Sequence, residues 1–125
     1  MVPVHVTIDA DRYLIRVKYV EPYTFDEWLG GVATFRNHRV APFDKRFGLL
    51  IDRTGVGDLP TSFASQIVKR VSASAHLVKQ RRIAIVVRLE GVGPATLQGM
   101  MYEEAGAFVG VFTSIAEAEH WLERR

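Results

Sequence analysis

The chain has 125 residues, 48% of them hydrophobic and 24% charged, with a formal charge of +2 and no cysteine. This length suits one domain that buries roughly two thirds of the surface its unfolded form exposes. The composition argues against a disordered chain and against a membrane protein. Without cysteine the chain has no disulfide, no thiolate metal site and no cysteine nucleophile.

The charge pattern and the length of the apolar runs indicate whether the protein binds nucleic acid or enters a membrane. The basic clusters are short and carry no interleaved aromatic residues, so we expect no nucleic-acid binding. The first residues have neither a basic head nor a long apolar segment, and no later run is long enough to span a bilayer. We therefore expect a cytoplasmic protein without stable membrane insertion.

The first part of the chain predicts a hairpin and then an aromatic helix. Residues 4–8 and 13–20 alternate apolar with polar side chains around a short Asp-bearing connection, which is typical of two antiparallel strands. Thr24 and Glu27 form a capping box that begins a helix. Gly30 and Gly31 lie inside this helix, where they predict a close backbone contact or local mobility. One face of the helix is apolar and carries Phe25, Trp28, Leu29, Val32 and Phe35.

Three strands then alternate with three helices. Residues 47–51, 82–87 and 107–112 are the apolar runs that predict the strands. The helices are predicted between residues 63 and 78, from Pro94 as first helical position, and after a capping box of Ser114 and Glu117. We therefore predict one α/β domain over residues 1–125, with a mixed, mostly parallel five-stranded sheet flanked by four helices.

Ligands and partners of open parallel sheets usually lie at the carboxyl ends of the strands. Here those ends carry residues 52–60, residues 88–93 and the turn at Thr113 and Ser114. The strand ending in Ile51-Asp52-Arg53-Thr54-Gly55-Val56 and the helix start at Thr61-Ser62 resemble the SpoIIAA-like STAS domains. The ending FTSIAEAEHWLERR is similar to the last strand and helix of that branch.

The resemblance implies a non-enzymatic regulatory domain, like the anti-sigma-factor antagonists of that family, that binds a protein partner or a second copy of itself. The implied contact surface comprises Asp52, Arg53, Thr54, Gly55, Asp58, Thr61 and Ser62. In the antagonists the second motif reads Asp-Ser-Ser/Thr-Gly and bears a phosphorylated serine. Here Pro60 and Phe63 replace the aspartate and the glycine, and Thr61 or Ser62 takes the phosphorylatable position.

The hydroxyl at this helix start has a second interpretation, because serine and threonine are common N-caps. A phosphate there would add about −1.5 to −2 charges at a helix N-terminus, which favours anions. It would therefore act by blocking a partner or by repelling Asp58, and not by melting the helix.

The aromatic helix suggests an alternative function. Its side chains, together with two methionines, would line an apolar pocket for a small apolar ligand or lipid, as comparison with the lipid-binding CRAL-TRIO domains suggests. The same residue types at helical spacing also suit a plain core. The predicted pocket residues are Tyr23, Phe25, Trp28, Phe35, Met100 and Met101.

Catalytic and cofactor motifs are incomplete. Gly91-Val92-Gly93 lacks the third glycine of a dinucleotide fingerprint, and Gly55-Val56-Gly57 precedes no Gly-Lys-Ser/Thr. The four histidines lack metal-ligand spacing, and no Gly-x-Ser-x-Gly elbow is present. We therefore expect no enzymatic activity, no cofactor and no metal.

Overall fold

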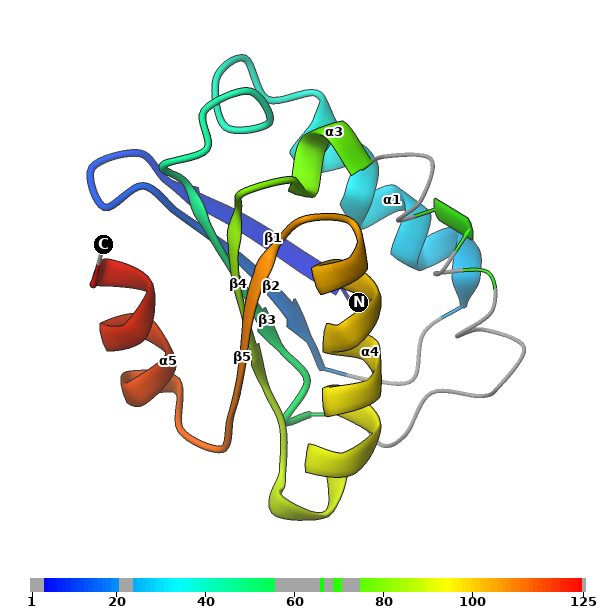
Figure 1. The fold of residues 1–125 in the computed structure, drawn as a ribbon. Helices are drawn as coiled ribbons and strands as arrows, with labels where there is room; N and C mark the ends of the chain where they lie inside the picture. Colours follow the sequence, from blue (N-terminus) through cyan, green and yellow to red (C-terminus); the bar gives the residue numbers. More distant parts are fainter. Residues whose placement is uncertain (1–3, 21–23, 56–65, 67–68, 71–74, 125) are drawn as a thin grey trace.

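A computed structural model of the chain describes residues 4–20, 24–55, 66, 69–70 and 75–124 (Figure 1). Its five strands form one sheet in the order β1-β2-β3-β4-β5. The first pair is antiparallel and the other three pairs are parallel, which confirms the predicted mostly parallel α/β sheet. The strands are β1 Val4–Asp9, β2 Leu14–Tyr19, β3 Gly48–Asp52, β4 Arg82–Val86 and β5 Phe108–Phe112. The helices are α1 Phe25–Arg36, α3 Ala75–Val78, α4 Val92–Glu104 and α5 Ile115–Glu123, with a 3-10 turn η1 at Leu89–Gly91.

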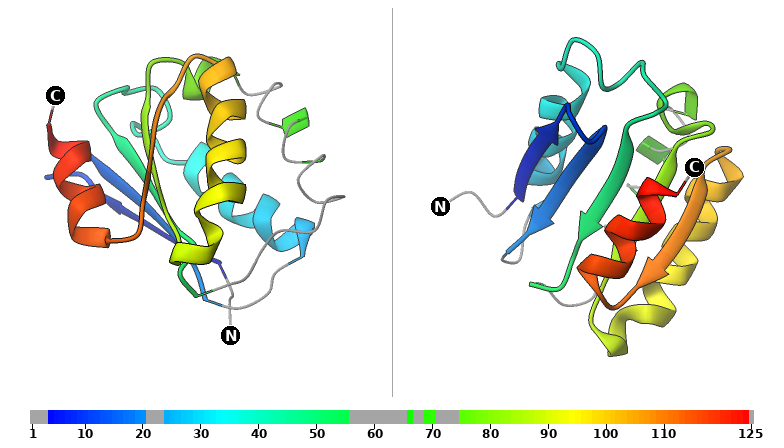
Figure 2. Two further views of the ribbon diagram at one scale, coloured as in Figure 1. Left: turned by 60° about the horizontal axis from the view of Figure 1, so that its bottom comes forward. Right: turned by 90° about the vertical axis from the view of Figure 1, so that its left-hand side faces the viewer.

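The sequential strand order determines which face each helix covers. Each new parallel strand is added on the same side of the last, so right-handed crossovers bring the connecting helices to one face. Accordingly α1 packs on β1 and α4 packs on β5 on that face, while α5 packs on β3 and β4 on the opposite face (Figure 2).

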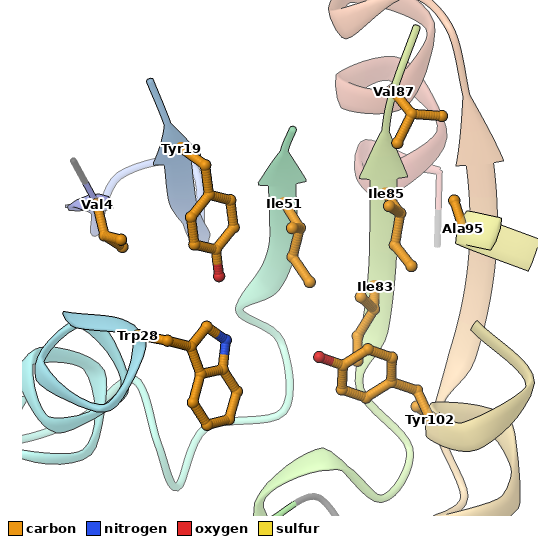
Figure 3. Packing of buried hydrophobic residues seen from close by; sticks show 10 residues of the cluster. Val4, Tyr19, Trp28, Ile51, Ile83, Ile85, Val87, Ala95 and Tyr102 are labelled. Carbon is orange, nitrogen blue, oxygen red and sulfur yellow. The ribbon is translucent and has the colours of Figure 1, made fainter. Parts of the chain in front are cut away.

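The core has a layer on each side of the sheet. The layer under α1 and α4 contains Trp28, Ile51, Ile85 and Tyr102 (Figure 3). The layer under α5 contains Leu14, Leu50, Ala84, Val86, Ala118 and Leu122. Because β4 is covered on both faces, all of its side chains after Arg82 are buried.

Local signals begin α1 and α5 as expected. Thr24 N donates to Glu27 Oε1 at 2.9 Å, and Glu27 N donates to Thr24 Oγ1 at 3.1 Å. Both bonds of the predicted capping box are therefore present. At α5, Ser114 Oγ accepts from Glu117 N at 3.3 Å.

One predicted helix is described only in part, and another begins earlier than predicted. The helix predicted between residues 63 and 78 lies largely outside the described residues, and its described end is α3. Helix α4 begins at Val92, so Pro94 is its third residue rather than its first. Proline is tolerated there because the first N–H groups of a helix have no acceptor within the helix.

Arg81 connects the loop before β3 to the start of β4. Its side chain is fully buried and donates to the carbonyl oxygens of Leu77 at 2.9 Å, Phe47 at 2.8 Å, Pro42 at 3.0 Å and Ala41 at 3.2 Å. Burial lowers the pKa of Arg81 to about 10, while Asp44 raises it. The guanidinium thus satisfies main-chain oxygens that would otherwise be buried without donors.

Candidate functional site

The carboxyl ends of β3 and β4 lie side by side, at the lower end of the sheet in Figure 1, with Asp52 paired to Val86. We use the name carboxyl rim for six described residues at or just beyond these ends. They are Asp52, Arg53, Thr54, Gly55, Arg88 and Leu89.

Asp52 shapes the turn after β3. Its buried carboxylate oxygen Oδ1 accepts from Thr54 N at 3.0 Å and from Thr54 Oγ1 at 2.7 Å. Such Asx-type bonds fix the backbone two residues beyond the aspartate. Asp52 therefore organises the rim from inside.

Arg53 is buried as well. Its N–H donates to the Val86 oxygen at 2.8 Å, its Nη1 donates to Gln98 Oε1 on α4, and its Nε has no hydrogen-bond partner. Burial raises the pKa of Tyr102, although the Gln98 hydrogen bond and the Arg53 charge lower it. The sequence places Asp52 and Arg53 on a contact surface, but both side chains are buried, because Arg53 reaches Gln98 on α4 and Asp52 bonds Thr54 in its own turn.

Thr54 and Gly55 are the residues of the turn after β3 that reach the surface. Arg88 Nε donates to the Thr54 oxygen at 2.7 Å, which joins the turn after β3 to the turn after β4. A Cβ at Gly55 would lie 2.7 Å from the Tyr19 oxygen, so only glycine fits this close approach. Thr54 is half-buried, Gly55 is exposed, and Leu89 is 80% exposed.

The remaining predicted contact residues, Asp58, Thr61 and Ser62, lie outside the described residues. Within the described part of the chain, no group of three or more His, Asp or Glu side chains could hold a metal ion. The described rim combines a hydrogen-bonded backbone with one exposed cation, Arg88, and one exposed leucine, Leu89.

Of the predicted apolar-pocket residues, Trp28 is buried, Met101 is half-buried and Met100 is 53% exposed. Tyr23 and the side chains of Phe25 and Phe35 lie outside the described parts. Trp28 lines a cavity of about 70 Å³ between α1 and the sheet. The other lining residues are Val4, Val17, Tyr19, Gly31, Leu49, Ile51 and Tyr102.

A larger, open depression of about 530 Å³ lies at the opposite, amino ends of the parallel strands. Each cation at its edge already has a protein partner. Lys45 Nζ donates to the His76 oxygen at 2.5 Å, Arg46 pairs with Asp44, and Arg82 lies over the Trp121 ring at 4.0 Å. The lining also includes Gly48, Gln80, Phe108 and Leu122.

Sequence reasoning missed the supports of the carboxyl rim on α4. Gln98 and Tyr102 are buried beside Ala95 and Gly99, at helical spacing. A lone glutamine in an otherwise small or apolar helix face was the available signal, because a buried amide needs a polar partner.

In the described part of the chain, no helix has both the length and the apolar character needed to cross a membrane. Comparisons with protein-family models, with curated proteins and with solved structures found no match to this chain. Function therefore has to be inferred from the geometry of the molecule itself.

Proposed function

We propose that this chain is a non-enzymatic interaction domain of the SpoIIAA-like STAS type that binds a protein partner at the carboxyl rim. The observation that carries the proposal is Leu89, whose side chain is 80% exposed beside a turn with a fixed backbone. A backbone that is already fixed loses little conformational freedom on binding, and burying a leucine stabilises a complex by about 1.5–3 kcal/mol.

The hydrogen bonds of the rim explain why its backbone is suited to recognition. Asp52 accepts from Thr54 within the turn after β3, Arg53 N donates to the Val86 oxygen at the end of β4, and Arg88 donates to the Thr54 oxygen across the two turns. Such cross-links hold Thr54 and Gly55 in one arrangement, so a partner meets a preformed surface. The turn of Asp52, Thr54 and Gly55 is also where the chain resembles the antagonist STAS domains, which supports a regulatory partner.

Photo-crosslinking tests the proposal. Benzoylphenylalanine placed at Leu89 is expected to give a discrete protein adduct in cells of the native host, and Leu89→Asp should abolish binding of the partner so identified. Phe43 is the matched control, because it is an apolar side chain 74% exposed in the loop before β3, near the amino ends of the parallel strands. Phe43→Asp should leave binding unchanged. Equal loss with both variants, or no loss with Leu89→Asp, would refute the rim as the contact surface.

A second candidate is a carrier of a small apolar ligand, which the cavity beside Trp28 favours. Its volume of about 70 Å³ equals roughly two water molecules at about 30 Å³ each, whereas ligand pockets usually measure about 300–1,000 Å³. A lipid would therefore require α1 to move away from the sheet. Native mass spectrometry of freshly purified protein separates the two functions, because a carrier retains a ligand mass and an interaction domain gives the apo mass.

A further inference from the structure

The two edge strands of the sheet differ in a way that points to a second copy of the chain. β1 carries His5, Thr7 and Asp9 on one face, which are polar groups of the kind that protect edges from pairing. β5 has the sequence FVGVF, and residues 105–113 around it contain no charged residue and no proline. Among the described residues nothing pairs with the outer side of β5 (Figure 2).

The hydrogen bonds to β4 show which groups of β5 remain at the free edge. Phe108 N donates to the Arg81 oxygen at 2.9 Å, and the Phe112 oxygen accepts from Val87 N at 3.0 Å. Because successive residues of a strand turn their main-chain groups to opposite sides, Val109 and Val111 direct theirs away from the sheet. These are the groups an added strand would bond.

We propose that β5 pairs with β5 of a second copy, antiparallel and in register about Gly110, to form a symmetric dimer with one continuous ten-stranded sheet. FVGVF reads the same in both directions. A two-fold axis at Gly110 therefore sets each Val109 opposite Val111 of the second copy, and the two valine pairs exchange about four main-chain hydrogen bonds. The same register sets Phe108 opposite Phe112 of the second copy.

The side chains favour this register. Phe108 is 57% exposed in the single chain, whereas Phe112 packs on Trp121 with ring centroids 5.6 Å apart. The pair of Phe108 with Phe112 of the second copy is of the closely spaced, non-hydrogen-bonded type, in which cross-strand side chains interact most. On the other face the two α4 helices approach the axis, and α4 carries no charge from Val92 to Tyr102.

Sedimentation and native mass spectrometry give the first test, with an expected mass of twice 14.1 kDa. Phe108→Lys places a charge opposite Phe112 of the second copy and is expected to weaken the dimer about tenfold or more, with the monomer fold retained because Phe108 is exposed. Thr7→Lys is the matched control on the exposed edge strand β1 and should leave the dimer unchanged.

Spin-label distances test the register without changing β5. The chain has no cysteine, so Thr113→Cys gives a single label site per copy. In the proposed register the two Thr113 Cα atoms lie about 20 Å apart, because six residues of extended strand separate their positions. Labels at Thr7→Cys on the two outer strands should lie about 40 Å apart across nine strand spacings.

Phe108→Lys and Leu89→Asp alter different surfaces, so the dimer and the carboxyl rim can be tested separately. A monomer at all concentrations, an unchanged dimer in Phe108→Lys, or a Thr113 distance well beyond 30 Å would each overturn it.

Discussion

Replacing Arg81 by methionine is expected to lower the free energy of unfolding by about 3 kcal/mol or more. Arg81 donates to the main-chain oxygens of Leu77, Phe47, Pro42 and Ala41 at 3.2 Å or less, and to that of Asp44 at the longer distance of 3.5 Å. A hydrogen bond from a charged donor contributes about 1.5–3 kcal/mol, so four such bonds contribute about 6 kcal/mol at the lower figure.

An opposing contribution comes from the guanidinium itself. Its burial lowers the pKa of Arg81 to about 10, which corresponds to a desolvation cost of about 3 kcal/mol that methionine does not incur. The net loss of about 3 kcal/mol is a large share of the roughly 5–15 kcal/mol that stabilises a typical domain. Arg81→Lys should lose less, because the ammonium still donates to some of these oxygens.

Urea unfolding followed by circular dichroism measures the effect. Arg88→Met is the matched control, because Arg88 is exposed and donates one hydrogen bond, to the Thr54 oxygen. That substitution should cost about 1 kcal/mol or less. If Arg81→Met costs no more than Arg88→Met, the assignment of Arg81 as the connection between the loop and β4 is refuted.

Three further predictions concern single positions. Gly30→Ala should raise the free energy of unfolding by about 1 kcal/mol in the same urea assay, because a Cβ at Gly30 meets no atom within 4 Å. Gly31→Ala should leave the free energy of unfolding unchanged or lower it, because a Cβ at Gly31 would lie 2.9 Å from a core side chain. Gln98→Leu should lower the free energy of unfolding by about 1–3 kcal/mol, because it leaves the buried Arg53 guanidinium without its acceptor. Arg53→Met should cost less, because it removes the cation as well. The opposite order would contradict the role of Gln98 as the acceptor for Arg53. Burial raises the pKa of Tyr102, so the folded chain keeps a proton that the unfolded chain releases near pH 10. The free energy of unfolding should therefore fall as the pH rises above about 10. Tyr102→Phe should make that fall smaller when unfolding is measured against pH.

Element types along the described chain follow from local patterns. Alternation and apolar runs predict the strands, and the Thr24 and Glu27 pair predicts the start of α1, because each signal acts over a few residues. The glycine pair in α1 marks where such reasoning stops. A close backbone contact or local mobility was expected there. Gly31 makes a close contact and Gly30 does not, since this depends on how α1 is rotated against β1.

At the carboxyl rim, too, one property can be predicted from the sequence and another cannot. Its position after β3 follows from the order of strands and helices, because parallel strands end at one edge. The burial of Arg53 does not follow, because its acceptor Gln98 comes from α4, 45 residues further along the chain.

The sequence by itself determined the strand and helix types, the single mixed sheet and the location of the turn after β3. The tertiary structure decided which side chains of that turn are interior, which glycine contacts the sheet, and that an uncharged, palindromic strand stands at an open edge. The physical reason is range: propensity and periodicity act between near neighbours, whereas burial and edge position depend on segments that meet only after the chain has folded.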